Sequence, residues 1–152
     1  MSKELFVKVN EVEGFDHRPE WYRPLAFGKN IYMNMTYLLP GVEFVMGSAR
    51  EKEEELLERV VYTMSGTIEV THGEDTVTLE PHTVFVVPLA PGLPFVVKNN
   101  TKETVSFMVA MSPPPHPEHP VYTRAELIEI YVQNKRMPKS PTEMEEMIQR
   151  GR

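Results

Sequence analysis

Few residues in this sequence can bind a metal or transfer a proton, and they are scattered. There are five histidines, at positions 17, 72, 82, 116 and 119, and no cysteine. Disulfides, thiolate catalysis and thiolate metal sites are therefore excluded. His116 and His119 lie in residues 112–120, where five of nine residues are proline. This segment predicts an extended strap, in which the three-residue spacing puts both imidazoles on one side. The spacing is compatible with a metal, although we expect a solvated, unligated connector.

The elements that position these residues are mostly short strands. Ile68 and Val70 alternate with polar residues, residues 72–75 (His-Gly-Glu-Asp) favour a tight turn, and Val77 and Leu79 resume the alternation, which predicts a hairpin. Further strands bounded by Pro, Gly or Asn are expected at residues 31–39, 42–46, 84–87, 95–97 and 105–111. An additional edge strand is expected at residues 5–9. Residues 15–24 are expected to form an irregular loop, which either packs its tryptophan on the outside of the fold or covers a barrel mouth.

Two segments resemble the motifs of the cupin family. The second cupin motif is matched by Pro91-Gly92 and by Asn99 as its closing residue, with Phe95 at the place of a metal-binding histidine. His82 replaces the first glycine of this motif, and one extra residue separates its halves. In the first motif, residues 60–66 match the strand that ends in glycine. Arg59 then stands where the family has a metal-binding glutamate, and no H-x-H sequence precedes it.

The resemblance covers residues 31–112 and implies an all-β fold, an antiparallel double-stranded β-helix or jelly-roll barrel. Residues 1–30 are then an N-terminal approach segment, residues 113–122 a proline-rich strap, and residues 123–152 a C-terminal α-helical extension. Thr123 with Glu126, and Ser140 with Glu143, form capping-box patterns that predict the starts of two helices. We expect Pro138 to close the first helix.

The resemblance also suggests a ligand site. If Arg59 occupies the inward glutamate position, strand alternation turns Val61 and Thr63 inward with it, facing Phe95 and Val97 on the opposite strand. An apolar interior with one guanidinium suits a small organic acid, because arginine binds carboxylates and phosphates bidentately. The alternative is that Arg59 points outward and pairs with a glutamate from residues 51–58.

A metal site is possible only in a second register. Starting the first motif at Gly47 places Glu53 and Glu55 at the H-x-H positions, where two carboxylates can hold a divalent metal ion such as Mg²⁺ or Mn²⁺. Arg59 and Phe95 oppose this interpretation, because neither side chain offers a lone pair to a metal. We therefore expect no metal cofactor, and we expect residues 48–58 to form a solvated acidic helix.

The resulting prediction is a metal-independent cupin that binds a small organic acid. The alternatives are a cupin enzyme, either a metal-free isomerase, epimerase or cyclase or a metal-dependent enzyme with divergent ligands, and a structural dimer with a filled barrel. An inward-facing histidine–acid pair would favour the enzyme. In the register given by the resemblance, no histidine lies on a barrel-facing strand position.

Bulk properties limit the partners. A length of 152 residues suits one domain, and the net charge of −6, without a basic stripe, argues against nucleic acid. No apolar run approaches the length of a bilayer span, and the first residues show no signal-peptide pattern, so we expect a cytoplasmic protein that does not bind membranes. The predicted edge strand at residues 5–9 and the two C-terminal helices suggest a homodimer.

Overall fold

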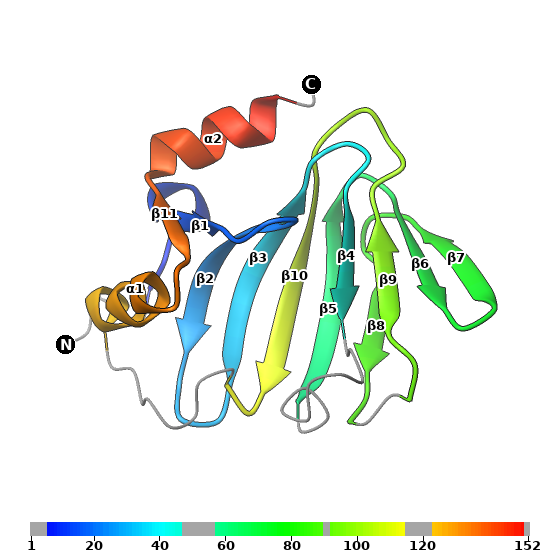
Figure 1. Ribbon diagram of the computed structural model, residues 1–152, viewed down its shortest axis with the longest axis horizontal. Helices are drawn as coiled ribbons and strands as arrows, with labels where there is room; N and C mark the ends of the chain where they lie inside the picture. The colour runs from blue at the N-terminus through cyan, green and yellow to red at the C-terminus, as the bar shows by residue number, and fades with distance from the viewer. Residues whose placement is uncertain (1–5, 47–56, 90–91, 115–122, 151–152) are drawn as a thin grey trace.

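The computed structural model describes residues 6–46, 57–89, 92–114 and 123–150, which form two packed antiparallel sheets with two helices outside them (Figure 1). The larger sheet has the strand order β11-β1-β2-β3-β10-β5-β8, and the smaller sheet has the order β4-β9-β6-β7. The strands are β1 (Gly14–Asp16), β2 (Trp21–Phe27), β3 (Tyr32–Leu38), β4 (Glu43–Met46), β5 (Glu58–Ser65), β6 (Ile68–His72), β7 (Asp75–Leu79), β8 (Val84–Val87), β9 (Phe95–Lys98), β10 (Val105–Ser112) and β11 (Met137–Lys139). The antiparallel jelly-roll architecture expected from the sequence is therefore present.

The main core lies between the two sheets and follows from strand alternation. On β5, Arg59, Val61 and Thr63 are buried, whereas Glu58, Val60 and Met64 are exposed. Inward side chains of this kind from both sheets form one apolar cluster, made of Leu38, Met46, Val61, Ile68, Val70, Val87, Val97, Val105, Phe107 and Val109. Because a one-residue shift would turn Val61 outward, this cluster fixes the register of β5.

Two turns explain residues that the motif resemblance singled out. Gly66, after β5, has φ +74°, and a Cβ there would lie 2.5 Å from Cγ1 of Val105. Only glycine combines that backbone with that approach. His82, at the place of a motif glycine, also has positive φ (+67°), and its Nδ1 lies 2.8 Å from the Tyr62 hydroxyl. The histidine therefore adopts the conformation that glycine usually supplies.

Asn99 ties the two sheets together through its fully buried side-chain amide. Its Nδ2 donates to the backbone oxygens of Leu38 (2.9 Å) and Glu103 (2.7 Å), and its Oδ1 accepts from the backbone N–H (2.9 Å) and the hydroxyl (2.7 Å) of Thr101. This network gives a physical reason for asparagine at the end of the second motif.

Replacing Asn99 with alanine is expected to destabilise the fold by about 3 kcal/mol, because two buried carbonyl oxygens lose their donor. Urea unfolding followed by circular dichroism measures the loss. The neighbouring Asn100 is exposed and its side-chain amide donates to the half-buried Glu69 carboxylate, so Asn100→Ala should change stability by less than about 0.5 kcal/mol. Equal effects of the two substitutions would contradict the assignment.

The C-terminal helices begin at the residues that the sequence predicted. The Thr123 side chain caps α1 (Arg124–Gln133), and Ser140 with Glu143 forms a capping box at α2 (Pro141–Gln149). Helix α1 ends earlier than expected, because Lys135 takes positive φ (+63°) and Pro138 lies in β11. No helix of the described residues is long and apolar enough to cross a membrane.

Both helices pack on the larger sheet at the end that contains β1 and β2 (Figure 1). From α1, Leu127 and Tyr131 pack against Phe15 and Tyr22. From α2, two buried methionines join a cluster that also contains Trp21, Leu25, Met35 and Tyr37. The irregular loop expected at residues 15–24 is wrong, because β1 and β2 occupy most of this segment. Trp21, in β2, packs outside the space between the sheets, as the first of the two expectations had it.

The N-terminal segment differs from the expectation. The predicted edge strand at residues 5–9 is wrong, because residues 6–8 are not in a strand and Val9–Glu11 is a short 3-10 helix. Instead, the larger sheet includes β1 and β2, two strands that precede residue 31. They join it because β2 pairs antiparallel with β3. The sequence of β2 shows no alternation because the residues from Tyr22 to Leu25 are all buried, and its proline at position 24 and the register shift between Pro24 and Ala26 obscure it further.

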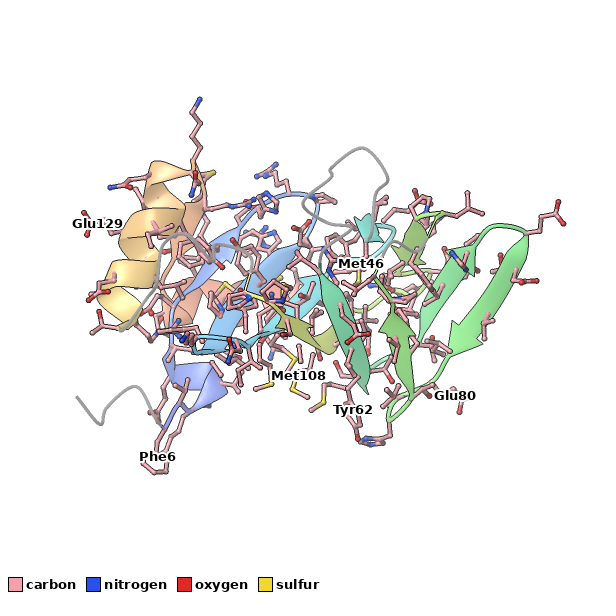
Figure 2. All side chains as sticks on the ribbon, turned by 90° about the horizontal axis from the view of Figure 1, so that it is seen from below. Phe6, Met46, Tyr62, Glu80, Met108 and Glu129 are labelled. Atoms are coloured by element: carbon pink, nitrogen blue, oxygen red, sulfur yellow. The ribbon has the colours of Figure 1, made fainter. Side chains whose placement is uncertain are left out.

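The outer face of β5 and β8 is apolar and exposed. Tyr62 and Met108 are paired across β5 and β10 and lie on the same face of the sheet (Figure 2). Beside them the exposed apolar side chains are Val60, Met64, Val84 and Val86. Because β8 is also an edge strand, this face offers both apolar area and unpaired backbone groups.

We propose that two copies of the chain pair through this face, and we expect a solution mass of about twice 17.5 kDa by light scattering at micromolar concentration. Val86→Glu should shift the mass to that of a monomer. Val77 is equally exposed but lies on β7 of the other sheet, so Val77→Glu should leave the dimer intact. A monomeric wild type would overturn the proposal.

Candidate functional site

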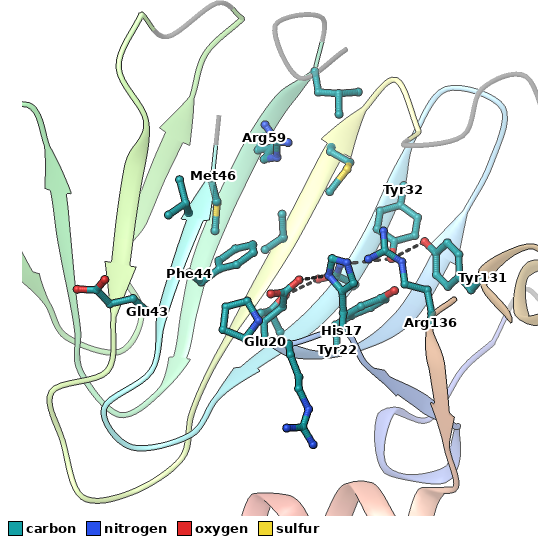
Figure 3. Close-up of a pocket in the computed structure, with 18 residues that line it drawn as sticks. His17, Glu20, Tyr22, Tyr32, Glu43, Phe44, Met46, Arg59, Tyr131 and Arg136 are labelled. Carbon is teal, nitrogen blue, oxygen red and sulfur yellow. Dashed lines mark hydrogen bonds and ion pairs between the residues drawn. The ribbon is translucent and has the colours of Figure 1, made fainter. Parts of the chain in front are cut away.

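A cavity of about 570 Å³ opens between the two sheets at the end where β5 begins and β10 ends (Figure 3). Its size falls within the usual range for small-molecule sites, roughly 300–1,000 Å³. Its wall combines charged, phenolic and apolar side chains from the β1–β2 turn, five strands and the C-terminal extension. The lining residues that the following argument uses are His17, Glu20, Tyr22, Tyr32, Arg59 and Arg136.

A histidine–glutamate pair lies in the cavity wall. His17 and Glu20 flank the tight turn between β1 and β2, which is closed by a hydrogen bond of 3.1 Å from the His17 backbone N–H to the Glu20 carbonyl oxygen. The turn brings the two side chains together, with His17 Nδ1 contacting Glu20 Oε1. The carboxylate is almost completely buried, whereas the imidazole is 40% exposed. The imidazole is therefore fixed by a buried acid and remains accessible.

Burial controls the charge of Glu20. Desolvation raises the pKa of the Glu20 carboxyl, and the nearby carboxylate of Asp16 raises it further, while a backbone hydrogen bond lowers it. Asp16 itself is held by Arg18, whose Nε lies 3.1 Å from the carboxylate. A carboxyl whose pKa is moved toward neutrality beside an imidazole is typical of groups that exchange protons.

This pKa shift predicts a pH-dependent effect of Glu20→Gln on stability. Since the pKa of Glu20 is higher in the folded than in the unfolded chain, the wild type loses stability as pH rises from the unfolded pKa, about 4.3, through the folded pKa. Glutamine does not ionise and avoids this loss. The variant should therefore gain stability relative to wild type between pH 4 and pH 8, measured by urea unfolding at both pH values. If the free energies of unfolding of the variant and the wild type differ by the same amount at pH 4 and pH 8, the raised pKa of the Glu20 carboxyl is contradicted.

Three buried tyrosines line the same cavity as the pair. The Tyr22 ring meets the His17 ring edge-on at 6.0 Å between centroids. The Tyr131 hydroxyl donates to the Tyr32 hydroxyl at 3.1 Å, and Asn34 Nδ2 donates to the same Tyr32 oxygen at 3.3 Å. Desolvation raises the pKa of each of the three phenols. All three are therefore protonated at neutral pH. Because the Tyr131 hydroxyl uses its proton on Tyr32, the hydroxyls of Tyr22 and Tyr32 are the ones able to donate into the cavity.

Arg59 lies in the cavity wall, on the inward side that the motif resemblance implied, and the residue is only 7% exposed. The structure therefore does not have Arg59 pointing outward, and most of the glutamates of residues 51–58 that the alternative paired with it lie outside the described residues. The other four residues predicted for the ligand site lie elsewhere. Val61 and Val97 are in the apolar core, and Thr63 donates to the backbone oxygens of Glu80 and Thr83.

Phe95, the fifth predicted residue, is also away from the cavity lining. Its ring stacks on the ring of His72 at 4.1 Å between centroids and packs against Phe85. Val61, Thr63, Phe95 and Val97 thus support the fold around the cavity, and Arg59 is the member of the predicted set that the structure places in its lining.

The metal centre of the usual cupin type does not fit the described residues. Among them, no group of three or more His, Asp or Glu side chains is placed to hold a metal ion. Arg59 is a cation at the position of the glutamate ligand, and Phe95 has no lone pair at the position of a histidine ligand. Glu53 and Glu55, and the strap histidines His116 and His119, lie outside the described residues.

The sequence analysis missed the His17–Glu20 pair, together with the tyrosines and Arg136. It assigned all site residues to the barrel segment 31–112, whereas the turn and both ends of the chain supply most of the polar lining. A local signal was present: His17 and Glu20 stand three residues apart around Pro19, in a sequence rich in turn-forming and aromatic residues. What the sequence could not show is that this turn faces the cavity.

Structural comparison supports the fold. No protein-family model matches the sequence, and no curated protein matches it either. Among solved structures, an RmlC-like cupin from Shewanella frigidimarina is similar with a TM-score of 0.58 and 18% identity, covering 71% of this chain and 89% of that one. KdgF from Halomonas sp. gives a TM-score of 0.55 and 16% identity, covering 66% and 84%. The described chain therefore has the cupin fold.

A third similar structure is described as a sugar phosphate isomerase of the cupin superfamily from Silicibacter pomeroyi. It shares a TM-score of 0.53 and 13% identity with this chain, covering 70% of this chain and 74% of that one. At such identities the likeness concerns the fold, and the chemistry must be argued from the side chains of this chain.

Proposed function

We propose that the chain catalyses metal-independent proton transfer on a small organic acid, as an isomerase or epimerase does. The observation that carries the proposal is the His17–Glu20 pair, which lies in the wall of the same cavity as Arg59. An inward histidine–acid pair is the feature expected to separate an enzyme from a simple binding protein with this fold.

The pair orients His17 as a general base. With Nδ1 directed at the Glu20 carboxylate, the neutral imidazole carries its proton on Nδ1 and its lone pair on Nε2. The carboxylate then stabilises the imidazolium that forms when Nε2 removes a proton. Removing a proton from carbon next to a carbonyl group produces an enolate, whose negative charge needs stabilisation.

The tyrosines and Arg59 supply that stabilisation. Tyr22 lies edge-on to His17 and stays protonated, so it can donate a hydrogen bond to the enolate oxygen. Arg59 binds the carboxylate or phosphate of the substrate at the wall formed by β5. Return of the proton to the same or a neighbouring atom completes an isomerisation or epimerisation without redox change. The similar fold of the structure described as a sugar phosphate isomerase is consistent with such a reaction.

Solvent exchange tests the proposal even though the product is not identified. A panel of hydroxy acids, oxo acids and sugar phosphates is incubated with the protein in heavy water, and loss of C–H signals is followed by proton nuclear magnetic resonance. We expect at least one class to exchange a single carbon-bound hydrogen faster than in buffer alone. Absence of exchange across the panel would overturn the proposal.

A second candidate is binding of an organic acid without reaction. The burial of Arg59 in the cavity wall favours simple binding, because an arginine can hold an organic acid without any catalytic group. The same panel distinguishes the two functions: a non-catalytic binder would be stabilised against heat by an acid that shows no exchange. An enzyme would give both stabilisation and exchange.

A further inference from the structure

Arg136 brings a second arginine into the cavity from the C-terminal extension. It follows the turn that ends α1, where Lys135 has positive φ and the Arg136 backbone N–H donates to the Tyr131 carbonyl oxygen at 2.9 Å. This turn reverses the direction of the chain. Arg136 therefore lines the cavity, although β11, the strand that follows it, lies at the edge of the larger sheet. Its place in the cavity is therefore built into the local backbone.

The guanidinium of Arg136 differs from those of three other arginines of the chain in having no carboxylate beside it among the described residues. Arg18, Arg23 and Arg124 each contact a carboxylate, from Asp16, Glu145 and Glu13 respectively. Arg136 forms no ion pair with any residue that the structure describes, and its Nε is buried there without a hydrogen-bond partner.

Leaving such a donor unsatisfied is unfavourable. A buried N–H without an acceptor has lost its hydrogen bonds to water without replacement, and the cost is greater when the group is charged. Burial lowers the pKa of the Arg136 guanidinium, yet arginine remains charged at neutral pH because its intrinsic pKa is so high. An anionic ligand in the cavity would supply both the missing acceptor and the missing countercharge.

The two cavity arginines are spatially separate. Figure 3 draws Arg59 on β5 and Arg136 beside Tyr131 in the C-terminal extension, well apart across the cavity. A single carboxylate therefore does not occupy both. The cavity volume of about 570 Å³ leaves room for a molecule of more than a few atoms.

We propose that the cavity takes a small molecule with two anionic groups, one bound by Arg59 and the other by Arg136. The inference deepens the proposed function, because it assumes that the substrate occupies this cavity, but it concerns recognition and not the proton transfer. Arg136 then selects dianions, such as dicarboxylates or phosphorylated acids, over acids with one charge. The proposal also gives the C-terminal extension a role in ligand binding, because this extension carries Arg136 to the cavity.

Titration calorimetry with unreactive ligands tests the proposal on the full chain. Saturated dicarboxylates of four to eight carbons are each compared with their own monomethyl ester, which keeps the length and removes one charge. For at least one length we expect the diacid to bind about tenfold or more tightly than the ester. In Arg136→Gln this preference should fall to about threefold or less, while the affinity for the ester stays unchanged.

Arg150→Gln is the matched control, since Arg150 is exposed beyond α2 and does not line the cavity. It should retain the full preference. A preference that persists in Arg136→Gln, or a panel in which no diacid binds better than its ester, overturns the proposal. Because these ligands do not react, the result is independent of solvent exchange. Absence of exchange in the wild type overturns the proton-transfer function, whereas a wild type without charge selectivity, or an Arg136→Gln variant that keeps it, overturns the role of Arg136.

Discussion

Replacing His17 with asparagine, or Glu20 with glutamine, is expected to slow solvent hydrogen exchange into the substrate by about 10²–10⁴-fold. Asparagine removes the accessible base. Glutamine keeps the shape of Glu20 but removes the charge that stabilises the imidazolium, since His17 Nδ1 contacts Glu20 Oε1 directly. The exchange rate of the most active compound of the panel, measured by nuclear magnetic resonance in heavy water, gives both effects.

The double variant separates a catalytic pair from two independent residues. If His17 acts through Glu20, the combined substitution should cost about as much as the larger single one, because groups that act as a unit are not additive. His82→Asn is the control, because that histidine lies in an exposed turn paired with Tyr62. Exchange that survives in both single variants would assign the chemistry to another group.

The fold was predictable from the sequence wherever strands alternate and turns are marked. The hairpin of β6 and β7, the strand Val84–Val87 and the capped starts of both helices all lie where local patterns place them. These elements are determined by side-chain period, turn residues and caps within a few residues of each other. Their prediction needs no information about distant contacts.

The site was less predictable, because its residues come together only through long-range pairing. The motif resemblance placed Arg59 on the inward side of its strand, and the structure has it in the cavity wall. His17, Glu20 and Arg136 reach the same cavity because β1 pairs with β2 on one side and with β11 on the other. That pairing joins residues more than 120 positions apart, and no local period in the sequence reports it.

Arg59→Met is expected to weaken binding of organic acids by about 100-fold, or roughly 2.7 kcal/mol. Methionine fills a similar volume but offers no donor, so the ligand carboxylate would lose its charge-assisted hydrogen bonds in a site where water is largely excluded. Thermal-shift assays detect the loss, since an acid present at 100 times its dissociation constant stabilises the wild type by about 2.7 kcal/mol.

The conservative variant identifies what Arg59 contributes. Arg59→Lys keeps the charge and loses the planar fork, so its affinity should fall between those of wild type and Arg59→Met. Urea unfolding without ligand shows whether each variant retains the fold. If acids stabilise wild type and Arg59→Met equally, they bind without Arg59, and the pair of arginines cannot define the charge of the substrate. If the lysine variant binds as weakly as the methionine variant, bidentate geometry is what the β5 wall of the cavity supplies.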